Sequence, residues 1–164
     1  MFYIQLIGII AFCIVVLSFY NKNPKTIIAY QIVSNFAYTV HYFLLGALSG
    51  AFISFIGIFR NIGLIKLKSN EGKKVLAMLI ILCYLAITVI FYENFYSIFP
   101  FIANSNYLLM MVNGERKSLI IGGIISSVMW LSYGIFVESY ASIITESILL
   151  ISNIRHFILI KKSR

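Results

Sequence analysis

The chain has 164 residues, of which 61% are hydrophobic and only 11% are charged, and its mean hydropathy is +0.97. A soluble globular domain has about 25% charged residues, so this composition excludes one and indicates an integral membrane protein. The formal net charge of +8 does not indicate nucleic-acid binding, because no polar segment carries a basic stripe with interleaved aromatic residues.

Seven apolar runs are each close to the length of about 20 residues that crosses a bilayer as a helix. They cover residues 2–20, 27–46, 49–67, 75–92, 96–113, 118–137 and 140–160. The fifth run is the weakest, because Asn104, Ser105 and Asn106 interrupt it. Open strand edges cannot satisfy their backbone in lipid. We therefore predict an all-α membrane protein with seven transmembrane helices.

Positive charge alternates between the links that join these runs. The links after the second, fourth and sixth runs hold no Lys or Arg and contain Glu93 and Glu138. The other three links and the C-terminal tail hold Lys22, Lys25, Lys68, Lys73, Lys74, Arg116, Lys117, Lys161, Lys162 and Arg164. Because cytoplasmic loops carry the excess of Lys and Arg, we predict the N-terminus outside and the C-terminus in the cytoplasm.

The chain also resembles itself at a distance of 92 residues. This shift lays residues 31–61 over residues 123–153 without a gap, although the identity is low. It pairs Tyr38 with Trp130, His41 with Tyr133, Ser54 with Glu146 and Asn61 with Asn153. The alignment crosses two predicted spans, so it indicates an internal duplication.

Two three-helix repeats follow from this alignment, at residues 1–67 and 96–162, with residues 75–92 as a linker helix. A single linker helix gives both repeats the same orientation, so the predicted layout is 3+1+3 with parallel repeats in one integral membrane domain. In repeat transporters the binding site lies near the bilayer midplane, at the interface of the repeats.

Two family resemblances follow from the motifs. Trp130-Leu-Ser-Tyr-Gly134, with Glu146 sixteen residues after the tryptophan, resembles the Trp-x-x-Tyr-Gly…Asn pattern of SWEET and SemiSWEET sugar transporters (MtN3-like, PQ-loop). In that family the Trp and the Asn line the central site, and the 3+1+3 layout is similar. Glu146 replaces the Asn here, which disfavours a neutral sugar.

The second resemblance is closer and covers almost the whole chain. Val40-His-Tyr-Phe-Leu-Leu-Gly46, Arg60 and Thr145-Glu-Ser147 resemble the YgjV family of bacterial inner-membrane proteins. This resemblance implies a multi-pass protein of the bacterial cytoplasmic (inner) membrane and implies little about activity.

Glu146 is the most informative candidate residue. A carboxylate near the middle of a bilayer costs about 2.5–3.5 kcal/mol on insertion scales, so a chain keeps one where it has a partner or a task. Glu146 either binds a cationic or hydroxylated solute or takes up a proton during the cycle, or it is a structural carboxylate that is protonated or is paired with Arg60 or a hydroxyl group. We expect Tyr38, Ser54, Trp130 and Glu146 to bind the substrate, with the two aromatic rings stacking on it.

Six further polar or special residues are candidates for support or gating of this site: His41, Arg60, Asn61, Pro100, Asn104 and Asn153. Each has a structural alternative. His41 relays protons or is a neutral ring bonded across helices, and Arg60 is an inner-gate cation, a counter-ion of Glu146, an anion ligand or a side chain that snorkels to the cytoplasmic face. Asn61 and Asn153 form a paired gate or pack as polar groups. Pro100, supported by Asn104, is a hinge or a static kink within the fifth helix.

Transport of a small polar solute (a sugar, polyol, amine or zwitterion) by alternating access is the function that this pattern favours, with proton coupling through Glu146. The alternative is a non-catalytic membrane-embedded binding or regulatory subunit. An intramembrane enzyme using Glu146 and His41 is a weaker third reading. We expect no catalytic residue, no cofactor and no metal, since Cys13 and Cys83 give no metal spacing. The expected partners are the solute and the lipid bilayer, with a homodimer left open and no nucleic acid.

Overall fold

A computed structural model describes residues 1–21 and 23–162, so Lys22 and Arg164, two of the predicted cytoplasmic cations, lie outside the described residues. Within this part of the chain the protein is all helical, as predicted. The helices are α1 (Phe2–Phe19), α2 (Pro24–Leu44), α3 (Leu48–Lys66), α4 (Asn70–Ile90), the short 3₁₀-helix η1 (Phe95–Ile98), α5 (Phe99–Asn113), α6 (Arg116–Phe136) and α7 (Tyr140–Lys162). Each of the seven α-helices overlaps one predicted run.

The largest difference in helix boundaries is at the start of α4. The sequence predicted a polar link up to Lys74, but the helix begins at Asn70. Ser69 is its N-cap, and the Ser69 hydroxyl oxygen accepts a hydrogen bond of 3.0 Å from the Gly72 backbone N–H. Because such a cap satisfies a backbone donor that a helix start leaves free, the polar residues form the first turn of α4 instead of a loop.

Five of the described helices are long and apolar enough to cross a membrane. They are α3, α4, α6, α7 and the continuous segment Phe95–Val112, which consists of η1 and nearly all of α5. The apolar stretch of α1, Phe2–Ser18, is shorter. Helix α2 carries polar residues such as Gln31, Asn35 and His41 along its length. That α1 and α2 also cross the membrane, which would give seven crossings, therefore stays a prediction.

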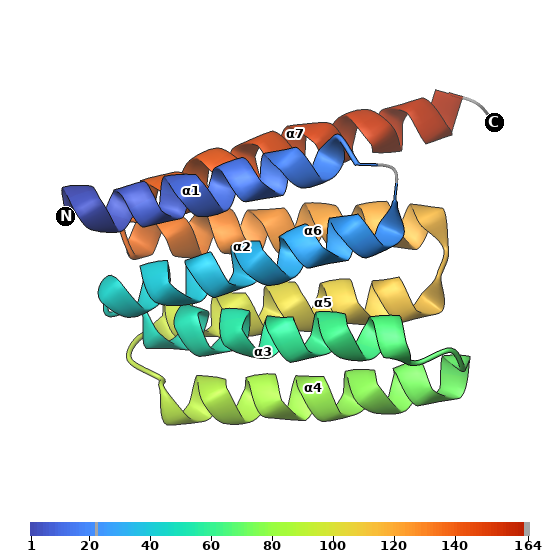
Figure 1. Cartoon of the computed structure of the whole chain (residues 1–164), viewed down its shortest axis with the longest axis horizontal. Helices are drawn as coiled ribbons and strands as arrows, with labels where there is room; N and C mark the ends of the chain where they lie inside the picture. Colours follow the sequence, from blue (N-terminus) through green and yellow to red (C-terminus); the bar gives the residue numbers. More distant parts are fainter. Residues whose placement is uncertain (22, 163–164) are drawn as a thin grey trace.

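The helices lie side by side along the long axis of the molecule, and the two ends of the chain are at opposite ends of the bundle (Figure 1). Consecutive helices pack against each other, α1 also packs against α7, and α3 also packs against α5. Six helices therefore form a closed ring, and α4 lies outside it against α3 and α5. We call the end that contains Met1 the N-terminal end of the bundle, and the opposite one the C-terminal end.

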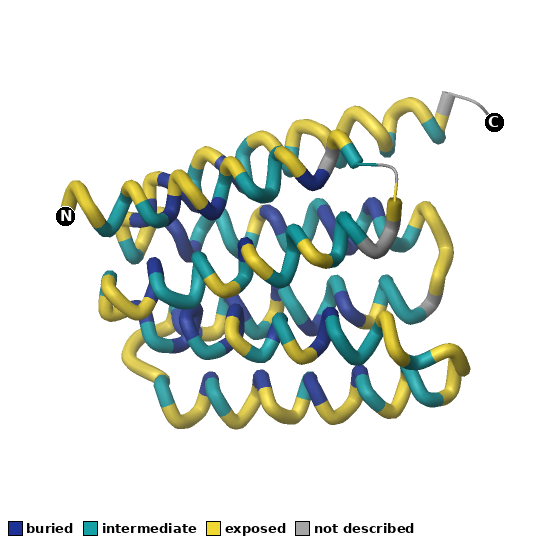
Figure 2. Tube along the Cα trace, viewed as in Figure 1, coloured by how far each residue is buried: buried dark blue, intermediate teal, exposed yellow. Residues whose placement is uncertain are grey.

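The bundle is apolar outside and polar inside, which is the arrangement that suits a bilayer. Helix α4 buries one stripe of residues at helical spacing, Ala77, Ile80, Tyr84 and Thr88. Its other faces expose large apolar side chains, as do the outer faces of the other helices. On α4 the buried residues face the bundle and the exposed ones face away from it (Figure 2). The buried polar side chains of the ring helices include His41, Ser54, Arg60, Asn61 and Thr145.

Two turns at the N-terminal end have the same backbone structure. Gly46 in the α2–α3 turn has a φ of 76°, and Glu138 in the α6–α7 turn has a φ of 55°. The backbone hydrogen bonds also agree: the N–H of Ala47 donates to the carbonyl of Tyr42, and the N–H of Ser139 donates to that of Gly134. Each residue of the first turn is 92 positions before its counterpart in the second turn, which is the same shift as in the sequence alignment.

Candidate functional site

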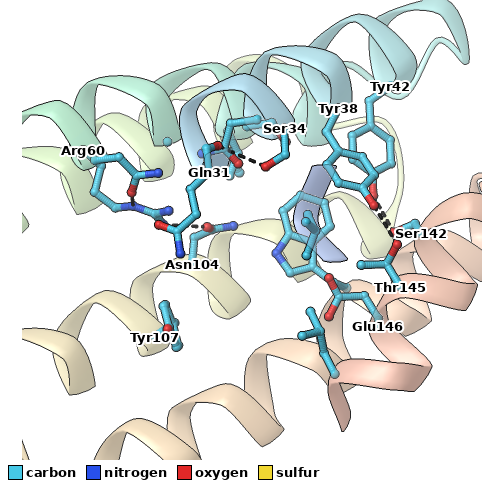
Figure 3. A pocket seen from close by; sticks show the side chains of 18 of the residues that line it. Gln31, Ser34, Tyr38, Tyr42, Arg60, Asn104, Tyr107, Ser142, Thr145 and Glu146 are labelled. Carbon is cyan, nitrogen blue, oxygen red and sulfur yellow. Dashed lines mark hydrogen bonds between the residues drawn. The ribbon is translucent and has the colours of Figure 1, made fainter. Parts of the chain in front are cut away.

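A cavity of about 170 Å³ lies inside the ring of helices (Figure 3). Its walls are Val15 of α1; Gln31, Ser34, Asn35, Tyr38 and Tyr42 of α2; Ile53, Ser54, Gly57, Arg60 and Asn61 of α3; Asn104, Tyr107 and Met111 of α5; Trp130 of α6; and Ser142, Thr145, Glu146 and Leu149 of α7. The structure thus brings together the four residues expected to bind substrate, which the sequence spreads over more than 100 positions. Their role in binding stays a prediction.

The acidic side of this cavity is built around Glu146, which is half-buried on α7. Its carboxyl group interacts with the hydroxyl of Ser127, which is buried on α6. Nearby, the Thr145 hydroxyl donates to the Ala141 carbonyl at 2.8 Å, so Tyr38 is the donor in the 2.7 Å bond between the Tyr38 and Thr145 hydroxyls. The lone pairs of the Tyr38 oxygen stay available, and this side is rich in hydrogen-bond acceptors.

The basic side of the cavity is built around Arg60, which is only 8% exposed. Its Nε donates to the Asn61 side-chain oxygen and its Nη1 to the Asn104 side-chain oxygen, each at 3.1 Å. Arg60 therefore points into the bundle, which disfavours snorkelling to the cytoplasmic face, one of the four roles left open for it. Its bonds to two amides hold it there.

Arg60 and Glu146 lie on opposite sides of the cavity (Figure 3). No ion pair with an N···O distance of 4.0 Å or less joins these two described side chains. The direct Glu146–Arg60 pair that the sequence left open is therefore not formed. The cavity therefore contains one cationic and one acidic side chain that do not contact each other.

Aromatic rings form a third wall. Trp130 stacks on Tyr42 with a centroid distance of 5.5 Å and an interplanar angle of 20°, and Tyr42 stacks on Tyr38 at 5.9 Å and 25°. Tyr42 is only 2% exposed, and its hydroxyl is hydrogen-bonded to that of Ser142 at 2.7 Å. This row fixes the position of the Trp130 ring, because one ring face is already covered.

His41 does not line the cavity. Its ring is fully buried, with Nδ1 at 2.8 Å from the Ile4 carbonyl oxygen and Nε2 at 2.7 Å from the Ser139 hydroxyl oxygen. A carbonyl can only accept, so Nδ1 donates, and Nε2 of the neutral ring accepts from the serine. His41 therefore ties α2 to α1 and to the start of α7, as in its structural reading. It lines neither of the two cavities that Glu146 lines.

The expectation of a kink at Pro100 within the fifth helix is wrong. Pro100 stands in the first turn of α5, which then runs to Asn113. A proline in a first turn removes no intrahelical hydrogen bond, because that N–H has no partner there. The Pro100 carbonyl accepts a 3.0 Å bond from the Asn104 side-chain amide. Pro100 thus starts a helix, and α5 has no hinge at this position.

Asn61 and Asn153 do not form the paired gate that the sequence suggested. A second cavity, of about 380 Å³, shares Arg60 and Glu146 with the first one and extends to Asn153 and Gly123. Asn153 packs closely on Gly123, where a Cβ atom would lie 2.8 Å from the Asn153 side-chain nitrogen. Asn61 lines only the first cavity, and no hydrogen bond joins these two described side chains.

Hydrogen bonds between the first three and the last three helices cluster in the half of the bundle nearest Met1. The pairs are Gln5 with the backbone of Glu138 and Tyr140, Tyr38 with Thr145, His41 with Ser139, Tyr42 with Ser142, and Tyr133 with Ser49 and Gly50. The Arg60–Asn104 bond lies deeper. The cavity that reaches Asn153 lies instead toward the C-terminal end.

Sequence reasoning missed several of these residues, above all Tyr42, Tyr133, Ser142 and Thr145. A signal was present on α2, where Gln31, Ser34 or Asn35, Tyr38 and Tyr42 recur at spacings of three or four. In a helix these positions share one face. A polar stripe in an apolar helix marks the face that turns away from lipid.

Among the residues that the structure describes, no group of three or more His, Cys, Asp or Glu side chains is placed to hold a metal ion. Residues 2–164 match the model of a protein family, Imp-YgjV, described as bacterial inner membrane protein. Comparison with curated proteins gives no match, and comparison with solved structures gives none. The match and the membrane-crossing helices make the chain a multi-pass protein of the bacterial inner membrane, as the sequence predicted.

Proposed function

The chain belongs to the Imp-YgjV family of bacterial inner membrane proteins, and on that premise we propose that it carries a small polar solute across this membrane by alternating access. One observation carries the proposal. A single cavity takes charged, polar and aromatic side chains from both halves of the chain, and among the described residues most hydrogen bonds between the halves lie on one side of it.

The proposed architecture is 3+1+3, with α1–α3 and α5–α7 as parallel repeats and α4 as the linker. The packing supports it, because the first helix of each half packs against the last helix of the other half: α1 contacts α7, and α5 contacts α3. The matched turns at Gly46 and Glu138 support it as well. The matched residues His41 and Tyr133 support it too, because each is bonded at the start of the last helix of the other half. His41 is bonded to Ser139, directly before α7, and Tyr133 is bonded to Ser49 and Gly50 of α3.

The proposed orientation places the N-terminal end in the periplasm, as the positive-inside rule requires. In this orientation the cluster of hydrogen bonds closes the periplasmic side, and the cavity that reaches Asn153 faces the cytoplasm. A further cavity, lined by Glu93, Tyr133 and Glu138 among others, lies at the N-terminal end. It would be the periplasmic entrance, and the buried Tyr42 and Tyr133 rings separate it from the central site.

In the proposed cycle the two repeats rock against each other around Tyr38, Ser54, Trp130 and Glu146. Breaking the hydrogen bonds at the N-terminal end opens the site to the periplasm, and closing the C-terminal end seals it from the cytoplasm. The likeness to SWEET-type transporters fits this scheme, because Trp130 and Glu146 share one cavity. Proton coupling, where it occurs, runs through Glu146, and Asn153 belongs to the cytoplasmic route.

Two other roles were open from the sequence. A binding or regulatory subunit would present a polar or small-residue face outward without a central cavity, whereas this bundle exposes apolar side chains and encloses a polar cavity. We also propose that the chain is not an enzyme, since both ring nitrogens of His41 are bonded to Ile4 and Ser139 and His41 does not line the cavity of Glu146.

The experiment is exchange of radiolabelled sugars, polyols, amines and amino acids by the purified protein in liposomes. A transported solute is expected to exchange with internal solute at a rate that saturates. Glu146→Gln is expected to abolish the pH dependence of this exchange where a proton is coupled. Glu71→Gln, which changes an exposed carboxylate in the first turn of α4, is the matched control. Absence of exchange for every class would contradict the proposal.

A second measurement tests the alternation. In a background with Cys13 and Cys83 replaced by alanine, a single cysteine at Ser54 is treated with a membrane-impermeant maleimide from each side. We expect reaction from the cytoplasmic side, and a shift toward the periplasmic side when Tyr42→Phe removes the bond to Ser142. Reaction from one side only, whatever the variant, would speak against alternation.

A further inference from the structure

The central cavity contains one fixed positive and one potentially negative side chain, and they are not paired with each other. Arg60 comes from α3 and Glu146 from α7, so each half of the chain contributes one (Figure 3). A charge in a site of low polarity is costly unless a partner neutralises it. The residues around each of the two side chains indicate which partner would fit.

The Arg60 side of the cavity has spare hydrogen-bond donors. The bonds to Asn61 and Asn104 use two of the five guanidinium N–H groups, and the buried Tyr84 hydroxyl also interacts with the guanidinium. Because the Asn61 oxygen accepts from Arg60, the Asn61 amide nitrogen is turned away, and it is buried without an acceptor among the described residues. A carboxylate matches the fork of an arginine with two parallel bonds. This side therefore suits an oxyanion.

The Glu146 side has spare acceptors and aromatic surface. The carboxyl group interacts with one hydroxyl, that of Ser127, and the Tyr38 oxygen keeps its lone pairs since its proton is donated to Thr145. Trp130 lines the same cavity, and an indole ring attracts a cation at short range. Carboxylate, phenol oxygen and indole together are a setting for an ammonium group.

The volume limits the size of a bound molecule. Drug-sized ligands occupy cavities of about 300–1,000 Å³, whereas this one has about 170 Å³. A solute held within this cavity alone has a short carbon skeleton. The second cavity, of about 380 Å³, also borders Arg60 and Glu146 and gives a longer solute room toward the C-terminal end.

We propose that the solute is a small zwitterion whose ammonium group binds at Glu146 and whose carboxylate binds at Arg60. This inference rests on the proposed transport function and names its substrate class. A simple amine would leave Arg60 without a counter-charge, and a simple acid would leave Glu146 without a cation, so that its carboxyl group would hold a proton instead. A neutral sugar would neutralise neither side chain.

The test is equilibrium binding to the full-length protein purified in detergent, measured by calorimetry and by thermal shift. The probes are three zwitterions of increasing length (glycine, β-alanine and 4-aminobutanoate), then butylamine, butanoate, 1,4-butanediol and glucose. We expect one zwitterion to bind at least tenfold more tightly than every singly charged or neutral probe.

Charge variants assign the two ends. Glu146→Gln is expected to weaken zwitterion binding about 10- to 100-fold and to leave butanoate binding unchanged. Arg60→Gln is expected to weaken zwitterion binding by a similar factor and to leave butylamine binding unchanged. Arg60→Lys keeps the charge without the fork and is the second variant should Arg60→Gln fail to fold. Glu71→Gln and Arg155→Gln, both exposed, are the matched controls.

Tightest binding of glucose or the diol, or zwitterion binding that Glu146→Gln leaves intact, would overturn the inference. Transport is measured separately, so the two proposals fail independently. A zwitterion that binds with this charge dependence and does not exchange across liposomes refutes the transport function and leaves the binding assignment. Exchange of a sugar by a protein that binds no zwitterion supports the transport function and refutes the binding assignment.

Discussion

The two ends of the bundle differ in how the halves of the chain meet. At the N-terminal end, tyrosine, histidine, serine and glutamine side chains bond one half to the other, as with His41 and Ser139. Toward the C-terminal end a cavity lined by Asn153 and Gly123 lies between helices. In lipid, apolar helix surfaces gain little by leaving the solvent, so interhelical hydrogen bonds and close packing decide which end is firm. The hydrogen-bonded N-terminal end therefore stabilises the bundle, and the cavity that would give access to the central site lies toward the opposite end.

The largest expected effect comes from removing His41. His41→Phe leaves the Ile4 carbonyl and the Ser139 hydroxyl without their partner in a buried place, at a cost of about 2–4 kcal/mol. We expect a clear fall in the thermal unfolding midpoint in detergent. His156→Phe, at an exposed position on α7, is the control, and an equal fall there would mean that His41 does not tie the N-terminal end.

A smaller effect is expected from Tyr133→Phe. The Tyr133 hydroxyl is 3.0 Å from both the Ser49 hydroxyl and the Gly50 backbone N–H. Gly50 is in the first turn of α3, where backbone N–H groups lack helical partners. Losing this cap from the other half should cost about 1–2 kcal/mol. Tyr92→Phe, exposed, is the control, and an unchanged unfolding midpoint for Tyr133→Phe would refute the capping role.

The two matched turns give a pair of opposite effects. Gly46→Ala puts a side chain on a residue with a φ of 76°, and Glu138→Gly removes one from a residue with a φ of 55°. Left-handed backbone costs an L-residue about 1–2 kcal/mol, so the first variant should unfold at lower temperature and the second at higher temperature. Shifts of the same sign would show that the two turns are not equivalent.

At the C-terminal end we expect the smallest change in stability. Asn153 packs on Gly123, and a polar interhelical contact contributes only about 0.6 kcal/mol on average. Asn153→Ala should therefore barely move the unfolding midpoint while it widens the second cavity, which labelling of the Ser54→Cys variant from the cytoplasmic side would report. A loss as large as that of His41→Phe would contradict the difference between the two ends.

The sequence placed the helices well because apolar length and polar breaks are local signals. It also paired Gly46 with Glu138 through the 92-residue shift, and those turns have one backbone structure. It did less well with single polar residues. Arg60 was left between four roles, and Pro100 was given a kink that its place in the first turn of α5 rules out. The sequence does not reveal a helix start that follows a 3₁₀ turn such as η1.

By itself, the sequence determined a membrane-embedded helical bundle, its approximate helix boundaries and the short set of polar residues that cannot face lipid. Only the tertiary structure decided which of these residues meet in the cavity and which bond the halves together. The reason is that lipid-facing and packed surfaces of a membrane helix are both apolar. The pattern therefore leaves open how each helix is rotated about its axis. That rotation turns Arg60 toward the cavity and His41 away from it.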